Sequence, residues 1–206
     1  MTSPYDADWA WNQAAHCYEL DGQLEEAGRC YANARQFRQA ARVFRAAGNV
    51  RATAAMESRA ERYTVAAWIY VHELGDVDAA RTSLQADPLS LTPTAGTELL
   101  LGRRLVEVRC DLAAGAPAET ALPVLADLQN YLATEQPPIR ALHVEDWGIA
   151  IAEAANRFDQ VALTFAAALR GGDPAAGERW RRWAQDRYGQ RIVIPQATPA
   201  ATREAA

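Results

Sequence analysis

Lysine is absent from the 206 residues, so arginine supplies all 21 of the Lys and Arg positions. This absence excludes a P-loop lysine, a Schiff-base lysine and a lysine general base. Arginine in place of lysine, together with abundant alanine, is typical of GC-rich bacterial genomes. No apolar run reaches the roughly 18 residues of a membrane span, so we expect no contact with a membrane interior. The net charge of −5 also disfavours general attraction to nucleic acid or anionic lipid.

Metal ligands are scarce as well. Three cysteines, an odd number, fit a reduced cytoplasmic protein better than a disulfide scaffold. The strongest metal candidates are His16, Cys17 and Cys30, but no Cys-x-x-Cys or His-x-x-x-His pair supports zinc there. Cys17 and Cys30 share a repeat position with Val43 and Ile69, which predicts both as small, buried apolar side chains. We therefore expect no metal.

Catalytic patterns are missing too. None of the four serines lies in Gly-x-Ser-x-Gly, and no Gly-x-Gly-x-x-Gly follows a strand. His143, Glu145 and Asp146 resemble acid–base machinery, but a helix surface next to a proline break explains them equally well. We therefore expect neither an enzyme nor a cofactor.

The sequence does contain an internal repeat. From Gly22 it divides into blocks of 13 residues, and a similar block, from Trp9 to Asp21, precedes them. In each block a large apolar residue is followed after three positions by a small residue, and after four more by an aromatic residue or leucine, with Glu57 as the exception. Spacing of i, i+3 and i+7 marks one face of a helix and cannot be a strand. The large residues are Trp11, Leu24, Phe37, Val50, Tyr63 and Val77.

Glycines at alternate block boundaries (Gly22, Gly48 and Gly75) double the unit to 26 residues, which predicts pairs of antiparallel helices. From Trp11 to Ala34 the first pair reads W-x-x-A-A-x-x-Y-x-x-x-G-x-L-x-x-A-x-x-x-Y-x-x-A. This pattern resembles the tetratricopeptide repeat, although the usual period is about 34 residues. The resemblance implies a right-handed α-solenoid whose concave groove binds peptide segments.

We expect three parts along the chain. Residues 1–87 form the repeat region of three helical hairpins, which the turn-like segment DPLSLTP from Asp87 to Pro93 closes. Residues 88–195 form a helical extension with a degenerate hairpin at about 139–169 and an extended stretch at 191–195. Residues 196–206, rich in Ala, Thr and Pro, are expected to be a disordered tail.

Positive charge is concentrated in part of the repeat region, where residues 22–62 hold eight arginines and only four acids. Arg35, Arg38, Arg42 and Arg45 are spaced to form one stripe on one helix. The tetratricopeptide resemblance implies that these positions line the concave groove. The equivalent positions of the neighbouring units include Trp9, Asn12, His16 and Trp68.

Such a groove suits an acidic peptide or a C-terminal carboxylate, because guanidinium groups bind carboxylates with two hydrogen bonds and tryptophan supplies anchoring area. The alternative is that the arginines form a solvated face or pair with the protein's own acids.

A second basic cluster lies near the C-terminus, where tryptophans alternate with Arg179, Arg181, Arg182 and Arg187. Interleaved basic and aromatic residues can bind single-stranded nucleic acid. Trp180 and Trp183 share one helix face, however, so we expect them to pack inward while Arg181 and Arg182 reach solvent. The acidic middle of the chain also argues against a nucleic-acid partner.

Together these patterns predict an all-α solenoid of antiparallel hairpins with a helical C-terminal extension. We expect a cytoplasmic adaptor or scaffold that binds another protein through an acidic segment. Apolar ends of a solenoid also favour self-association, which leaves a homodimer open.

Overall fold

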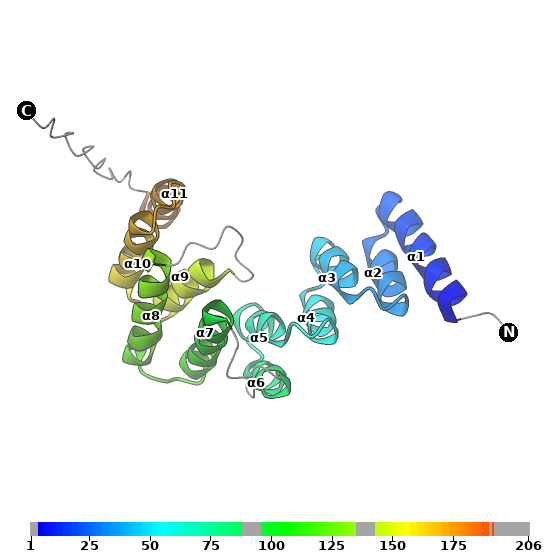
Figure 1. The fold of residues 1–206 in the computed structure, drawn as a ribbon, viewed down its shortest axis with the longest axis horizontal. Helices are drawn as coiled ribbons and strands as arrows, with labels where there is room; N and C mark the ends of the chain where they lie inside the picture. Colours follow the sequence, from blue (N-terminus) through cyan, green and yellow to red (C-terminus); the bar gives the residue numbers. More distant parts are fainter. Residues whose placement is uncertain (1–3, 88–95, 135–142, 190, 192–206) are drawn as a thin grey trace, which may run out of the picture.

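The structure is a computed structural model that describes residues 4–87, 96–134, 143–189 and 191. Within those ranges the chain forms eleven α-helices and one short 3₁₀ helix, and it contains no strand. Successive helices pack on one another along an open arc (Figure 1). The prediction of an all-α, solenoid-like fold is confirmed. None of the helices in these ranges is long and apolar enough to cross a membrane.

Six helices form three consecutive hairpins in the repeat region, and the second to sixth are each ten residues long. The large apolar residue of each block from Leu24 onward is the first residue of its helix. These helices are α1 (Pro4–Leu20), α2 (Leu24–Asn33), α3 (Phe37–Ala46), α4 (Val50–Arg59), α5 (Tyr63–His72) and α6 (Val77–Ala86).

The turns between these helices share one backbone conformation. Gly22, Gly48 and Gly75 have positive φ angles, as the glycine pattern predicts. Arg35 and Glu61 take the same conformation at the boundaries without glycine, with φ of 55° and 61°. The turn after α2 is closed by a hydrogen bond from Gln36 N to Tyr31 O, 2.9 Å long, and the turns after α1, α3 and α4 repeat this arrangement. The turn after α5 is one residue longer and is closed by a hydrogen bond from Asp76 N to Tyr70 O.

Small residues allow the helices to approach closely. The small position of the repeat is fully buried at Ala27, Ala40, Ala66 and Ala80. A Cβ atom on Gly28 of α2 would lie 2.7 Å from the Phe44 ring of α3, so this ring rests directly on the α2 backbone. The stacking contact between hairpins therefore consists of a ring on one helix and a small residue on the next.

The extension after residue 87 adds five more α-helices in the described ranges, and α9 packs against α10. These elements are α7 (Thr97–Ala113), the 3₁₀ helix η2 (Ala118–Ala121), α8 (Leu122–Thr134), α9 (Val144–Ala154), α10 (Phe158–Arg170) and α11 (Ala176–Tyr188). Helix α7 packs against α5, and α9 packs against α7, so one core cluster runs from Ala67 to Ala167 across the expected boundary. The expected break at 88–93, extended stretch at 192–195 and disordered tail at 196–206 lie outside the described residues.

Candidate functional site

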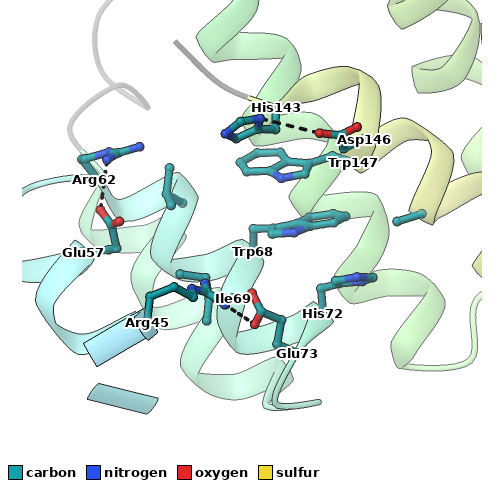
Figure 2. A pocket seen from close by; sticks show the side chains of 12 residues that line it. Arg45, Glu57, Arg62, Trp68, Ile69, His72, Glu73, His143, Asp146 and Trp147 are labelled. Carbon is teal, nitrogen blue, oxygen red and sulfur yellow. Dashed lines mark hydrogen bonds and ion pairs between the residues drawn. The ribbon is translucent and has the colours of Figure 1, made fainter. Parts of the chain in front are cut away.

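Two adjoining cavities form one groove on the concave side of the arc. The first, of about 410 Å³, lies over α3 and α4, and the second, of about 580 Å³, lies between α5 and α9. Arg45, Glu57 and Arg62 line both cavities, so the two cavities adjoin. Figure 2 shows the residues that line the second cavity. We call the two cavities together the groove.

Helix α3 supplies most of the groove's positive charge. Its apolar face, with Ala40, Val43 and Phe44, is buried against the neighbouring helices, which turns Arg38, Arg42 and Arg45 toward the groove. Arg62, the residue before α5, adds a fourth guanidinium group that the arginine spacing did not predict.

Arg35 is a correction to the predicted stripe. It stands in the turn between α2 and α3, not on the helix, and it does not line the groove. Its spacing from Arg38 matches a helix, but α3 begins only at Phe37.

Three of these four groove arginines pair with acids of the protein itself. Arg42 Nη2 lies 2.8 Å from Glu19 Oε1 of α1, and Arg45 pairs with Glu73 just after α5. Arg62 Nη1 lies 3.4 Å from Glu57 Oε2. The hydrogen bond from Arg42 lowers the pKa of the Glu19 carboxyl, despite its partial burial.

Arg38 differs from these three arginines. It is exposed at the edge of the first cavity, and within the described ranges it makes neither an ion pair nor a hydrogen bond with another side chain. It is therefore the groove arginine whose guanidinium hydrogen-bonding positions are open to a ligand.

Glu57, the exception to the repeat's apolar pattern, lies at the junction of the two cavities. Its side chain is only 14% exposed, and its buried Oε2 atom makes no hydrogen bond to any described residue. The departure from the repeat thus places a carboxylate inside the groove, where the pattern would place a ring.

An aromatic stack forms the floor of the second cavity. The Trp68 ring of α5 lies between His72 and the Trp147 ring of α9, with centroids 4.6 and 4.8 Å away. Because both faces of Trp68 are covered and it is 7% exposed, it does not offer the open ring face expected of a peptide anchor. Burial also lowers the pKa of His72, which favours its neutral form.

Helix α9 closes one end of the groove. The Trp147 ring of α9 stacks on Trp68 of α5, and His143 and Asp146 line the same cavity, 3.6 Å apart between Nδ1 and Oδ2 (Figure 2). The C-terminal half therefore packs back against the repeat region at this point. The sequence periodicity did not predict that α9 lines the groove, because α5 and α9 belong to different parts of the chain.

The predicted groove residues of α1 lie elsewhere. Trp9, Asn12 and His16 do not line either cavity, and Trp9 is 67% exposed. Cys17 is also exposed, so the prediction that it is buried is wrong, whereas Cys30 is buried as predicted. No group of three or more potential metal-ligating side chains occurs in the described part of the chain.

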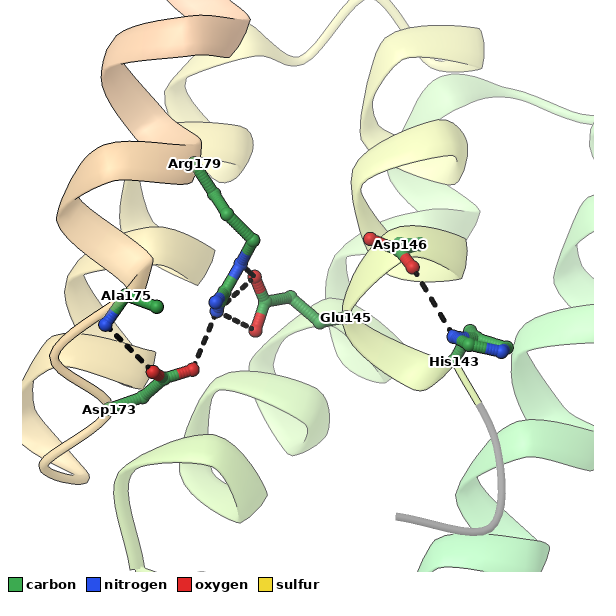
Figure 3. A network of polar contacts seen from close by, with 6 residues as sticks. All are labelled: His143, Glu145, Asp146, Asp173, Ala175 and Arg179. Carbon is green, nitrogen blue, oxygen red and sulfur yellow. Dashed lines mark hydrogen bonds and ion pairs between the residues drawn. The ribbon is translucent and has the colours of Figure 1, made fainter. Parts of the chain in front are cut away.

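Most of the second basic cluster is occupied by internal contacts. Arg179 Nε and Nη2 donate to the two oxygens of Glu145, each 2.9 Å away, and Nη2 also donates to Asp173 at 2.7 Å (Figure 3). Arg181 pairs with Glu178, and the Arg187 guanidinium lies 5.3 Å from the Phe158 ring centroid. Arg181 and Arg182 are exposed, as predicted.

The tryptophans beside this cluster pack inward, as predicted. Trp180 stacks on Phe165 with ring centroids 6.2 Å apart, and Trp183 Nε1 donates to Glu153 at 2.9 Å. Rings held in this way are not free to stack on nucleic-acid bases.

Comparison of this chain with models of known protein families, with curated proteins and with solved structures finds no match. The resemblance to the tetratricopeptide repeat therefore depends on the sequence pattern alone and stays a prediction.

Proposed function

We propose that this protein is a non-catalytic, cytoplasmic adaptor that holds an acidic segment or a C-terminal carboxylate of another protein in the groove. The observation that carries the proposal is Arg38, an exposed guanidinium without a side-chain partner in the described chain, at the edge of a cavity that Arg42, Arg45 and Arg62 also line. Carboxylates are the ligands that such a row of forked donors fits best.

The internal ion pairs do not block this function. Arg42 and Arg45 are 58% and 44% exposed, and exposed pairs of this kind contribute only about 0.2–1 kcal/mol each. A ligand carboxylate can therefore replace Glu19 or Glu73 at small cost. In the absence of ligand, the same pairs hold the arginine side chains over the groove, which reduces the entropy lost on binding.

The length of the groove also supports a peptide ligand. Its two cavities run from α3 to α9, and the second has apolar side chains such as Val65 and Ile69 beside the charged ones. A peptide can place acidic side chains at the α3 end and an apolar side chain against α5, whereas a small anion would fill only one part of the groove.

The test is binding of a fluorescein-labelled oligo-glutamate peptide, measured by fluorescence anisotropy at low and moderate salt. We expect Arg38→Glu to weaken binding by about 1–4 kcal/mol, with unchanged helicity by circular dichroism. The matched control is Arg182→Glu, which reverses an exposed arginine outside the groove and should bind like the wild type. Wild-type protein that does not bind the peptide, or equal losses in both variants, would overturn the proposal.

A capture experiment from lysate extends the test to natural partners. A protein retained by the wild type and lost with Arg38→Glu is the expected result. Capture that nuclease treatment abolishes and that depends on Arg182 instead would favour nucleic-acid binding by the C-terminal cluster.

A further inference from the structure

The charged side chains of the groove are divided between its two ends. Among the described residues, those that line only the first cavity include Arg38 and Arg42 and no acid. Those that line only the second cavity include Glu73 and Asp146 and no arginine. Burial lowers the pKa of His72, so its favoured neutral form adds no positive charge to the second cavity. The groove is therefore positive at the α3 end and negative at the α9 end.

The charged residues that both cavities share are paired with acids of the protein itself. Arg62 Nη1 lies 3.4 Å from Glu57 Oε2, and Arg45 pairs with Glu73. The apolar side chains of Val65 and Ile69 also line the second cavity. A segment that lies along the whole groove would thus contact a positive end, a paired and partly apolar middle, and a negative end.

The two acids of the negative end lie at different edges of the second cavity. Figure 2 shows Glu73 beside Arg45 and, across the tryptophan stack, Asp146 beside His143. The Asp146 side chain is 68% exposed, and it makes no ion pair with an arginine of the described chain. Its contact with His143, 3.6 Å between Oδ2 and Nδ1, is an ion pair only when the imidazole is protonated. The Asp146 carboxylate is therefore open to a cation.

Binding of an acidic ligand also changes the surroundings of Glu73. Arg45 is its ion-pair partner in the described chain, and the Glu73 side chain is 29% exposed. A ligand carboxylate that takes Arg45 leaves this partly buried acid without a cation, which carries a small cost. Glu19, in contrast, keeps the hydrogen bond from Tyr31 Oη, 3.0 Å long, when Arg42 is taken. A ligand cation in the second cavity would offset the cost at Glu73.

We propose that the segment held in the groove carries a basic side chain beyond its acidic run, and that Asp146 and Glu73 bind this cation while Arg38 and Arg42 bind the acids. This cation site depends on the proposed function, because it acts on a segment that the arginines already hold. A uniformly acidic segment would bring a carboxylate against Asp146, where like charges repel. The negative end thus selects for one order of charges along the ligand.

The test compares fluorescein-labelled peptides by fluorescence anisotropy at about pH 8, above the ordinary pKa of histidine. Each peptide has a run of glutamates, a neutral spacer of about three to eight residues, which add about 3.3 Å each when extended, and then lysine or norleucine. Both chain directions are measured. The lysine peptide should bind the wild type about two- to fivefold more tightly than the norleucine peptide, the range for one exposed ion pair. A peptide with the lysine inside the glutamate run has the same net charge and should show no such gain.

Variants of the two acids locate the cation. Asp146→Asn should bring the ratio of the two affinities close to one. Glu73→Gln should lower this ratio and also strengthen binding of the norleucine peptide, because it removes the internal competitor for Arg45. The matched control is Asp186→Asn, which changes an exposed acid of α11 outside the groove and should keep the wild-type ratio. Circular dichroism confirms that each variant is folded.

The outcomes separate this cation site from the acidic ligand itself. The cation site is wrong, and the proposed function stands, if the norleucine peptide binds through Arg38 but lysine gives no gain at any spacer length. A gain from lysine that persists in both Asp146→Asn and Glu73→Gln also overturns the cation site, because the cation then binds elsewhere. If the wild type binds no peptide of the set, both proposals fall.

Discussion

Replacement of Gly148 by alanine tests how closely α9 packs against the rest of the molecule. A Cβ atom at this position would overlap Cδ2 of Leu128 on α8. Leu128 is fully buried, so it can make room only by leaving its rotamer or by pushing the two helices apart. Alanine in a helix is favoured over glycine by about 1 kcal/mol, whereas an overpacked core costs about 1–3 kcal/mol.

The overlap involves the side chain of a fully buried leucine, so we expect the packing cost to exceed the propensity gain. The predicted result is a net loss of up to about 2 kcal/mol in the free energy of unfolding. Urea denaturation followed by circular dichroism measures this loss. Tryptophan fluorescence in the native state reports the accompanying shift, because the adjacent Trp147 stacks on Trp68.

A double-mutant cycle with Leu128→Ala is the control. Leu128→Ala alone should cost about 2–5 kcal/mol, and adding Gly148→Ala to it should cost little, because the Cβ then occupies the space that Leu128 leaves. The opposing results are that Gly148→Ala stabilises the protein, or that it lowers the free energy of unfolding equally in the wild-type and Leu128→Ala backgrounds. Either result would contradict the close contact between α8 and α9.

Two further predictions concern titratable groups. Burial raises the pKa of the Cys30 and Cys110 thiols, so both should react with maleimide only as fast as the protein unfolds, and prompt labelling of either in native protein would contradict the fold. The pKa of Glu19 is lowered from its ordinary value of 4.5 by the hydrogen bond from Arg42, so its stabilising contribution is present above pH 4.5 and lost as the pH falls through the lower folded pKa. The difference in unfolding free energy between wild type and Glu19→Gln should therefore shrink on acidification below pH 4.5, whereas a difference independent of pH would mean that Arg42 does not bind the carboxylate in solution.

The helices of the repeat region could be predicted closely from the sequence. The large apolar residue of each block marks the first residue of α2 to α6, because a similar tight turn, one residue longer before α6, fixes where the next helix begins. The glycines mark three of these five turns. Arg35 and Glu61 adopt the same conformation without glycine, which is why spacing alone placed Arg35 on a helix that does not include it.

The groove could be predicted only in part. Arg38, Arg42 and Arg45 follow from the helical spacing of α3, and they line the groove. The position of α9 beside the groove could not be predicted from the repeat, because Trp147 and Trp68 meet in a tertiary contact between segments far apart in the sequence. The ion pairs from Arg42 and Arg45 likewise join residues more than 20 positions apart, and charge counts along the sequence do not show which partners meet.

One repeat position shows why equivalent residues need not share a function. His16, Arg42 and Trp68 occupy the same place in three successive hairpins, and the tetratricopeptide resemblance assigns all three to one groove. His16 is exposed on the first helix, Arg42 lines the groove beside Glu19, and Trp68 is buried under α9. A repeat determines the direction in which a side chain points, but the neighbouring element determines what it meets. Because the middle hairpin presents an arginine at this position, and that arginine lines an open cavity, the carboxylate-binding capacity that we propose is concentrated on α3.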